Sequence, residues 1–234
     1  LNSGELQAWI DRGMRGQTSN PTIFQGAISG SKTYDDAIRK LAGEGKSAEA
    51  ICWDLMIADV QGACDLFMPV YQASGGKDGF VSLELDPTKA RDTQGSLTQG
   101  LELWPRVNRP NLMIKVPATR EGLPVIQGLL EAGFNVNVTL LFAVERYDEV
   151  MTVHMQALEN RLAAGHPIDS VASVASFFVS RVDSEVEKRF KGLSLSEAQK
   201  AGLLGKVAVA NARSAYASFQ QRLASDRWQA LASK

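Results

Sequence analysis

Segments of strand length alternate with segments of helical spacing along almost the whole chain, and the connections between them are short. This order is typical of parallel β/α units, in which each helix carries the chain back to the start of the next strand. The expected strands lie within residues 17–24, 80–86, 112–119, 135–142 and 170–182. Alternation alone is compatible with both a doubly wound sheet and a β/α barrel.

The expected helices fill the spaces between these strands, with apolar residues at helical spacing, as at Ile51, Leu55 and Ala58. No repeat, low-complexity segment or linker interrupts the pattern, so we expect a single domain over residues 1–234. One helix is expected to end near residue 11, and a long alanine-rich helix is expected over 206–233. The others are expected over 34–41, 47–71, 93–108, 122–131, 144–165, 185–191 and 196–204.

Lys115 lies in the middle of an apolar strand. The segment LMIKVPAT, residues 112–119, surrounds this lysine with apolar side chains before Pro117 ends the strand. Lysine is rarely buried without a partner or a task. Burial disfavours the charged form of an amine, and a neutral amine attacks carbonyl groups, which begins Schiff-base catalysis. The alternative is a structural lysine whose stem reaches the solvent.

Polar side chains recur on one face of the expected strands, near their carboxyl ends. Strands of a parallel sheet are covered on both faces and are usually apolar throughout. In a β/α barrel, inward positions at the carboxyl ends converge on one central pocket, where barrel enzymes act. Five strands that share this pattern therefore favour a barrel with a site inside it. The polar positions are Thr18, Asn20, Ser82, Glu84, Lys115, Asn137, Thr139 and Ser176.

The composition excludes several classes of function. The 234 residues are 44% hydrophobic and 22% charged, with a formal net charge of −1, so we expect neither a nucleic-acid nor a membrane partner. No GxGxxG motif follows a strand, which disfavours a dinucleotide site. Metal-ligand spacing is absent both between the two cysteines, Cys52 and Cys64, and between the two histidines, His154 and His166. We therefore expect no metal. No signal peptide and no long apolar run is found, so we expect a cytoplasmic protein.

The polar set suits the exchange of carbon–carbon bonds through an imine. Lys115 would attack a ketose carbonyl, and loss of water would give an iminium that accepts electrons. Glu84, on the neighbouring strand, would move protons during these steps, through a water molecule held by Thr139. The lysine itself supplies the electron sink, so the reaction needs no organic cofactor.

Two further groups of residues would bind the substrate. Asn20 and Asn137 can form hydrogen bonds with the hydroxyl groups of a three-carbon fragment. Arg181 follows Ser176 where we expect the last strand to pass into a loop, a suitable place to hold a sugar phosphate. The alternative for Arg181 is an ordinary surface arginine.

Five segments of the chain resemble transaldolase in their order and separation. They are TSNPTIF at 18–24, VSLELDP at 81–87, MIKVPAT at 113–119, NVNVTLLF at 135–142 and SFFVSR at 176–181. The similarity extends from about Gly16 to about Val182, and the combination is far more specific than any single segment. The resemblance implies a class I aldolase (β/α)8 barrel that moves a dihydroxyacetone unit between sugar phosphates in the pentose phosphate pathway.

The resemblance also implies a role for each matching residue. Lys115 would be the Schiff-base lysine, Glu84 the proton-transfer carboxylate and Thr139 the residue that helps hold the catalytic water. Related fructose-6-phosphate aldolases tend to carry tyrosine in place of Phe178 and glutamine in place of Glu84, so this pair indicates the transferase. The residues expected to bind the dihydroxyacetone part are Asn20, Asn137, Ser82 and Thr18. Those expected to bind the phosphate are Ser176 and Arg181.

Parts of the family pattern have no counterpart in this sequence. Transaldolases carry a catalytic aspartate on a first strand, and Asp11 cannot match it because we place Asp11 in the opening helix. They also continue beyond the last helix with two more strands and a second phosphate-binding arginine. Five expected strands, against the eight of a complete barrel, lead us to expect an incomplete barrel.

Other readings of the sequence remain open. The alternative activity is that of another Schiff-base aldolase, such as fructose-6-phosphate aldolase, which would cleave a substrate and release free dihydroxyacetone. It could also be an inactive barrel fragment that serves as a subunit or binding module. For partners beyond small sugar phosphates, a homodimer and a fusion with an isomerase domain are both compatible with the sequence.

Overall fold

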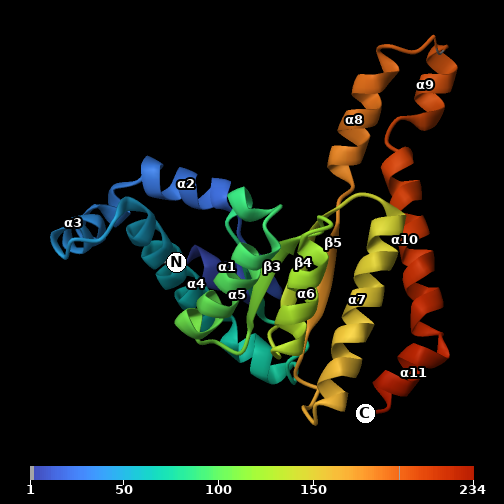
Figure 1. The fold of residues 1–234 in the computed structure, drawn as a ribbon. Coiled ribbons are helices and arrows are strands. Elements are labelled where there is room, and N and C mark those ends of the chain that lie inside the picture. Colours follow the sequence, from blue (N-terminus) through green and yellow to red (C-terminus); the bar gives the residue numbers. More distant parts are fainter. Residues whose placement is uncertain (1–2, 195) are drawn as a thin grey trace. The chain divides into compact units, whose positions relative to one another are not determined.

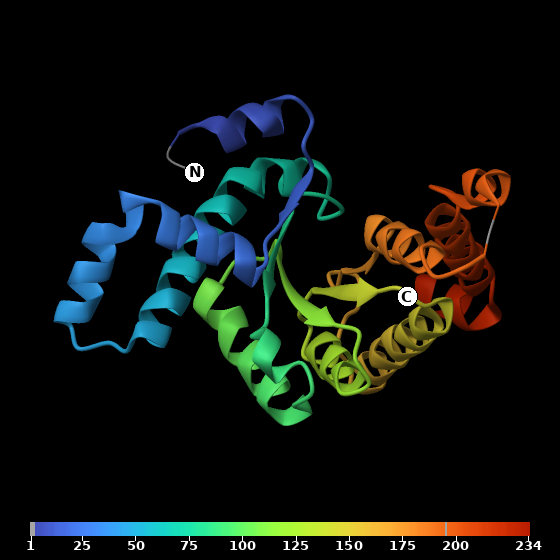
Figure 2. The same cartoon turned by 90° about the horizontal axis from the view of Figure 1, so that it is seen from above.

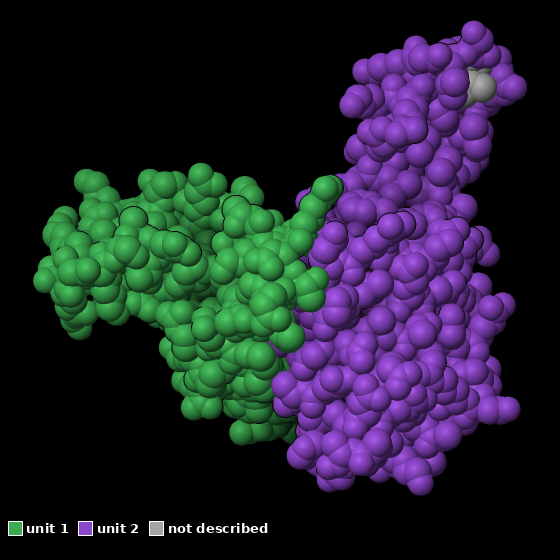
Figure 3. Space-filling model, viewed as in Figure 1, with its two compact units in different colours: residues 1–115, 134–136 green, residues 116–133, 137–234 purple. Residues whose placement is uncertain are grey.

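A computed structural model of the chain describes residues 3–194 and 196–234 (Figure 1; Figure 2). These residues form two compact units (Figure 3). Of the described residues, one unit comprises 3–115 and 134–136, and the other comprises 116–133, 137–194 and 196–234. A single domain over the whole chain stays a prediction.

The strands found in the described residues form one sheet, and their order in it is their order in the chain. They are β1 (Gly16–Thr18), β2 (Phe80–Glu84), β3 (Leu112–Pro117), β4 (Val136–Leu141) and β5 (Ser173–Phe177). β1 pairs in parallel with β2, and β2 in parallel with β3. A doubly wound sheet reverses its order at a switch point, whereas a barrel keeps the order of the chain. The predicted α/β class is confirmed, and the order agrees with an incomplete β/α barrel.

The two longest helices of the first unit begin where the sequence supplies a cap. The side chains of Ser47 and Asp92 accept hydrogen bonds from the backbone amides of Ala50 and Gly95, which stabilises the first turns of α4 and α5. The helices are α1 (Glu5–Asp11), α2 (Pro21–Gly30), α3 (Asp35–Gly43), α4 (Ala48–Ala73) and α5 (Thr93–Val107). Two short 3-10 helices, η1 (Lys32–Tyr34) and η2 (Pro87–Lys89), complete this unit.

The helices of the second unit are largely C-terminal. They are α6 (Gly122–Glu131), α7 (Val144–Ala163), α8 (Ser180–Phe190), α9 (Glu197–Leu203), α10 (Val207–Leu223) and α11 (Asp226–Ala232). α10 packs against both α7 and α8, and α11 packs against the end of α7 (Figure 1). This packing gives the C-terminal helices a buried face of their own.

The core of the first unit lies between α4 and the strands. β3 is buried along its whole length, with Leu112 and Ile114 fully inaccessible. Asn111, also fully inaccessible, precedes this strand and donates from its Nδ2 to the carbonyl oxygens of Cys64 and Gly79, each at 2.9 Å. One amide therefore connects α4, the loop before β2 and the start of β3.

Packing between α7 and α11 forms a smaller core in the second unit. Met155, Leu158 and Leu231 are buried there, and Trp228 packs against them. Arg227 adds a two-point ion pair with Glu159, with Nε donating to Oε1 at 2.6 Å and a terminal nitrogen donating to Oε2 at 2.7 Å. Paired guanidinium–carboxylate contacts of this kind fix orientation as well as add energy.

Leu140 interrupts the regular backbone of β4. Its φ of 60° is in the left-handed region, and its side chain is 39% exposed, whereas the neighbours Thr139 and Leu141 are buried. A leucine in this conformation costs roughly 1–2 kcal/mol. The contacts on either side of it must therefore hold the strand in place. The amide of Ala118 donates to the carbonyl of Thr139 at 2.9 Å, and the amide of Phe178 donates to that of Leu141 at 2.8 Å.

The strand predicted within residues 17–24 is shorter than expected. β1 ends at Thr18, and α2 begins at Pro21. The side chain of Asn20 accepts a hydrogen bond from the amide of Ile23 at 2.9 Å and so caps α2. Proline also favours the first helical position, because it has no amide hydrogen to leave unpaired. The residues after Pro21 are therefore helical.

Two boundaries near the C-terminus also differ from the prediction. The strand expected over 170–182 ends at Phe177, and α8 begins at Ser180, so Arg181 lies in the first turn of a helix. The single helix expected over 206–233 is divided into α10 and α11. Ser225 caps the second of these by accepting from the amide of Trp228 at 3.3 Å. Alanine-rich spacing did not reveal this internal cap.

Among residues 3–194 and 196–234, no helix combines the length and hydropathy that a membrane span requires. In the same part of the chain, histidine, cysteine and acidic side chains form no group of three or more that could hold a metal ion.

Candidate functional site

Lys115 and Glu84 are register partners on the parallel strands β2 and β3. The Nζ atom of Lys115 donates to Oε2 of Glu84 at 3.1 Å. The side chain of Lys115 is 9% exposed and that of Glu84 is 14% exposed, so the ion pair is largely shielded from water. Charges removed from water in this way interact strongly and are costly to separate. The sequence prediction that a carboxylate faces this lysine agrees with the geometry.

Ser19 provides a second contact to the lysine, and sequence reasoning did not single it out. Its backbone carbonyl accepts a hydrogen bond from Lys115 Nζ at 3.3 Å. The residue is buried, and both its amide and its hydroxyl donate to the carbonyl of Ser82, at 3.2 Å and 2.8 Å. The alternation of polar residues along the expected strand indicates its neighbours Thr18 and Asn20 instead. The available signal was a small hydroxyl residue placed directly between a strand and a helix cap.

The remaining predicted residues of the first unit lie near this pair in the sheet but differ in exposure. Thr18 is the register partner of Ser82. Ser82 is buried, whereas Thr18 is exposed. Asn20 uses its side-chain oxygen to cap α2, which leaves its Nδ2 group as the atom able to donate to a ligand. The unit thus groups Lys115 and Glu84 with hydrogen-bonding side chains from two neighbouring strands.

In the second unit, the predicted residues of β4 and β5 form a pair. Ser176 donates from its hydroxyl to Oδ1 of Asn137 at 2.8 Å, and Asn137 is 6% exposed. Thr139, 1% exposed, has a hydroxyl without a hydrogen-bond partner among the described residues. A buried hydroxyl normally has a partner. An unpaired hydroxyl at this position is therefore suited to holding a water molecule.

Phe178 and Arg181 lie side by side just beyond β5. The guanidinium carbon of Arg181 is 4.8 Å from the centre of the Phe178 ring, a cation–π distance. The Phe178 ring also packs against Phe142, with 5.3 Å between ring centres. Arg181 is exposed and belongs to the first turn of α8. A helix N-terminus with an arginine is a suitable environment for a phosphate, in place of the loop predicted from sequence.

These arrangements allow specific chemistry in each unit. In the first, a buried amine faces a carboxylate that can accept and return its proton, which is what imine formation requires. In the second, an amide–hydroxyl pair, an unpaired hydroxyl and an exposed arginine can bind hydroxyl groups, water and an anion.

Comparison with known proteins identifies the family of the chain. The family described as transaldolase/fructose-6-phosphate aldolase matches residues 1–231. The chain belongs to this family. The prediction of a transaldolase-type sequence with a barrel-type fold is thereby confirmed at the level of the family.

Several curated members of the transaldolase/fructose-6-phosphate aldolase family are similar over almost the whole chain. The transaldolase of Saccharopolyspora erythraea is 48% identical over all of this chain and 63% of its own length. That of Acidothermus cellulolyticus is 47% identical over all of this chain and 62% of its own length. That of Thermobifida fusca is 48% identical over 99% of this chain and 63% of its own length. The chain therefore spans somewhat over three fifths of the curated relatives it matches.

Proposed function

We propose that this protein is a transaldolase, which transfers a dihydroxyacetone unit between sugar phosphates through a Schiff base on Lys115. The observation that carries the proposal is the buried ion pair between Lys115 and Glu84 at the carboxyl ends of adjacent parallel strands. Barrel enzymes place their reactive groups at these strand ends. The three relatives described above are all named transaldolase, which supports the same reaction.

In the proposed reaction, the amine of Lys115 gives up a proton and attacks the ketose carbonyl carbon. Glu84 is the acceptor, because its carboxylate is the acidic group in contact with Nζ. The same carboxylate then returns a proton to the leaving hydroxyl group, and loss of water gives the iminium. The iminium accepts the electron pair released when the carbon–carbon bond breaks, and the resulting enamine attacks the acceptor aldehyde.

The other predicted residues hold the water and the substrate in this proposal. Thr139 binds the water that relays protons, a role supported by its unpaired hydroxyl. Arg181 and Ser176 bind the phosphate, supported by the position of Arg181 at the start of α8. Hydroxyl groups of the dihydroxyacetone part are bound by Asn20, Asn137, Ser82 and Thr18. Phe178 positions Arg181 through their ring contact.

The substrates of the proposed reaction are sedoheptulose 7-phosphate and glyceraldehyde 3-phosphate, which give erythrose 4-phosphate and fructose 6-phosphate in the pentose phosphate pathway. A homodimer and a fusion with an isomerase domain stay predictions, as does a cytoplasmic location.

Fructose-6-phosphate aldolase activity is the second candidate, since the matching family includes both enzymes. Glu84 and Phe178 favour the transferase, because the resemblance associates the aldolases with glutamine and tyrosine at these positions. The aldolase would release free dihydroxyacetone without an acceptor. An inactive barrel fragment that serves as a subunit or binding module would do neither.

Trapping with borohydride tests the proposal directly. The protein, whose 234 residues have a mass of 25.3 kDa, is incubated with fructose 6-phosphate, reduced with borohydride and analysed by peptide mass spectrometry. We expect a reduced three-carbon adduct on the peptide that contains Lys115. Lys115→Ala should abolish the adduct, whereas the surface variant Lys40→Ala should retain it. An adduct on another lysine, or none on the wild-type chain, would contradict the proposal.

A further inference from the structure

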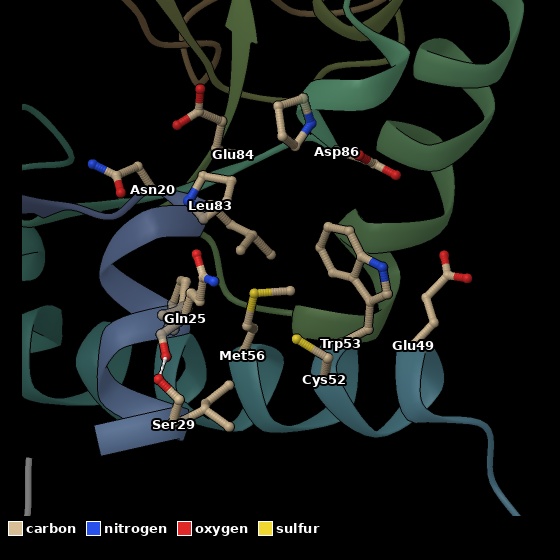
Figure 4. Close-up of a pocket in the computed structure, with 14 residues that line it drawn as sticks. Asn20, Gln25, Ser29, Glu49, Cys52, Trp53, Met56, Leu83, Glu84 and Asp86 are labelled. Atoms are coloured by element: carbon tan, nitrogen blue, oxygen red, sulfur yellow. Dashed lines mark hydrogen bonds between the residues drawn. The ribbon is translucent and has the colours of Figure 1, made fainter. Parts of the chain in front are cut away.

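A cavity of about 430 Å³ lies between α2, α4 and the carboxyl end of β2 (Figure 4). Its size is within the range of small-molecule sites. The inner wall is apolar and comes from Phe24, Ile28, Trp53, Met56 and Leu83. All of the lining belongs to the first unit, so the cavity is complete within it.

The cavity borders the lysine–glutamate pair, because Glu84 is part of its lining, but its apolar wall lies on the other face of β2. Leu83 and Glu84 are consecutive in β2, and consecutive strand residues point to opposite faces of a sheet. Glu84 uses its carboxylate to bind Lys115, and Figure 4 shows this carboxylate directed away from Met56 and Cys52. Leu83 instead lies toward these two side chains of α4. The apolar wall of the cavity therefore lies on the helix side of β2.

The charges around the cavity are all negative. The acidic residues in its lining are Glu49, Glu84 and Asp86, and the lining contains no lysine or arginine. A sugar phosphate would meet carboxylates here without a cation to bind it, so its phosphate is disfavoured. Glu84 already pairs with Lys115, and Asp86 accepts hydrogen bonds from the amide and hydroxyl of Thr88.

Glu49 is the carboxylate left to bind a ligand. Among the described residues it takes part in no hydrogen bond or ion pair. It lies one helical turn before Trp53 in α4, and Figure 4 shows the two side chains next to each other on the same side of this helix. A carboxylate beside an indole ring favours a cation, through both charge and the cation–π interaction.

We propose that this cavity binds a small molecule with an aromatic or aliphatic body and a protonated amine. The body lies against the apolar wall formed by α2 and α4, and the amine lies between Glu49 and Trp53. Asn20, the residue proposed to bind the dihydroxyacetone part, lines the cavity and caps α2, so an occupant lies beside it. Binding at this cavity does not depend on the proposed reaction.

Cys52 provides a direct measure of occupancy. Its side chain lines the cavity and is partly accessible, whereas Cys64 is fully inaccessible, and burial raises the pKa of the Cys64 thiol to about 12. Methyl methanethiosulfonate, a small neutral thiol reagent, should therefore modify Cys52 alone. The rate is followed by peptide mass spectrometry with phenethylamine as the probe ligand. At about ten times its Kd, a ligand leaves roughly one cavity in eleven empty, so the rate should fall about tenfold.

Matched ligands and variants decide whether the amine is recognised. The anionic analogue 3-phenylpropanoate should give less than twofold protection at the same concentration. Glu49→Gln should weaken protection by phenethylamine, and Glu102→Gln, the same charge change on the exposed face of α5, should leave it intact. Equal protection by amine and carboxylate, no protection by the amine, or a Cys52 that does not react in the free protein would each overturn the proposal.

Discussion

The backbone carbonyl of Ser19 accepts a hydrogen bond from Lys115 Nζ at 3.3 Å, although the two residues are 96 positions apart in the chain. The hydroxyl of Ser19 donates to the carbonyl of Ser82 at 2.8 Å, which fixes the turn that presents this acceptor. Ser19 is therefore a positioning residue for the amine, through its backbone.

Ser19→Ala removes the hydrogen bond to the carbonyl of Ser82 but keeps the backbone carbonyl that accepts from Lys115. The carbonyl should then be held less firmly in place. We expect the rate of borohydride-trapped adduct formation on Lys115 to fall by about tenfold, because a small misplacement of a reactive group is expensive in rate. Ser19→Thr keeps the hydroxyl and should restore most of the rate. A purely structural role would instead lower the thermal midpoint in Ser19→Ala while the trapping rate of the folded protein stayed unchanged.

Glu84→Gln preserves the shape of the site and removes the proton acceptor. General acid–base catalysis contributes roughly 10²- to 10⁴-fold, so adduct formation at Lys115 should slow by at least about 10²-fold. Glu102→Gln is the control for charge. Trapping rates and release of free dihydroxyacetone should be measured together. Unchanged trapping in Glu84→Gln would show that another group accepts the proton.

Thr139→Val replaces a buried, unpaired hydroxyl by a methyl group of similar size. The protein should not lose stability, because no hydrogen bond among the described residues is broken. The rate of adduct formation should fall by about tenfold or more if the hydroxyl holds the relay water. Thr139→Ser is the matched variant that keeps the hydroxyl, and equal rates in all three proteins would exclude this role.

Asn111→Ala should be strongly destabilising. The substitution leaves the buried carbonyls of Cys64 and Gly79 without their 2.9 Å donor and creates a small cavity. We expect a loss of roughly 2–4 kcal/mol in the free energy of unfolding, measured by urea denaturation. Asn211→Ala removes one hydrogen bond, to the carbonyl of Phe142, at a more accessible position and should cost under about 1 kcal/mol.

The stability of the second unit should fall in mild acid because of His154. Burial lowers the pKa of this histidine from 6.5 to about 4. Between these values the unfolded chain binds a proton that the folded chain does not, so the free energy of unfolding decreases as pH falls from about 6.5 towards 4. The decrease is at most roughly 3 kcal/mol. His154→Gln should reduce the change of the thermal midpoint with pH across this range. His166→Gln, at an exposed position, should not.

Much of the fold follows from the sequence because each strand and helix has a local signal. The apolar run around Lys115 and the alternation of residues 80–86 predict β3 and β2 to within two residues. The errors arose where two signals compete. Asn20 and Pro21 look like the end of a strand, yet they also form the cap and first position of α2.

From the sequence, only those site residues could be predicted whose side chains interrupt the apolar pattern of a strand. Glu84 and Lys115 were identified because both stand out on buried strands, and their registration follows from parallel pairing. Ser19 contributes through its backbone carbonyl, which no residue pattern reveals. The cavity behind β2 was also missed, because Glu49 and Trp53 look like ordinary residues of an amphipathic helix until α2 is placed opposite them.

The left-handed backbone of Leu140 places a strained residue directly after Thr139 in β4. Glycine adopts such a φ without penalty, so Leu140→Gly would relax the strand while the hydrogen bonds of the flanking carbonyls remain available. The conformation of Leu140 therefore sets the course of β4 immediately after Thr139, although Leu140 contacts no substrate in the proposed reaction.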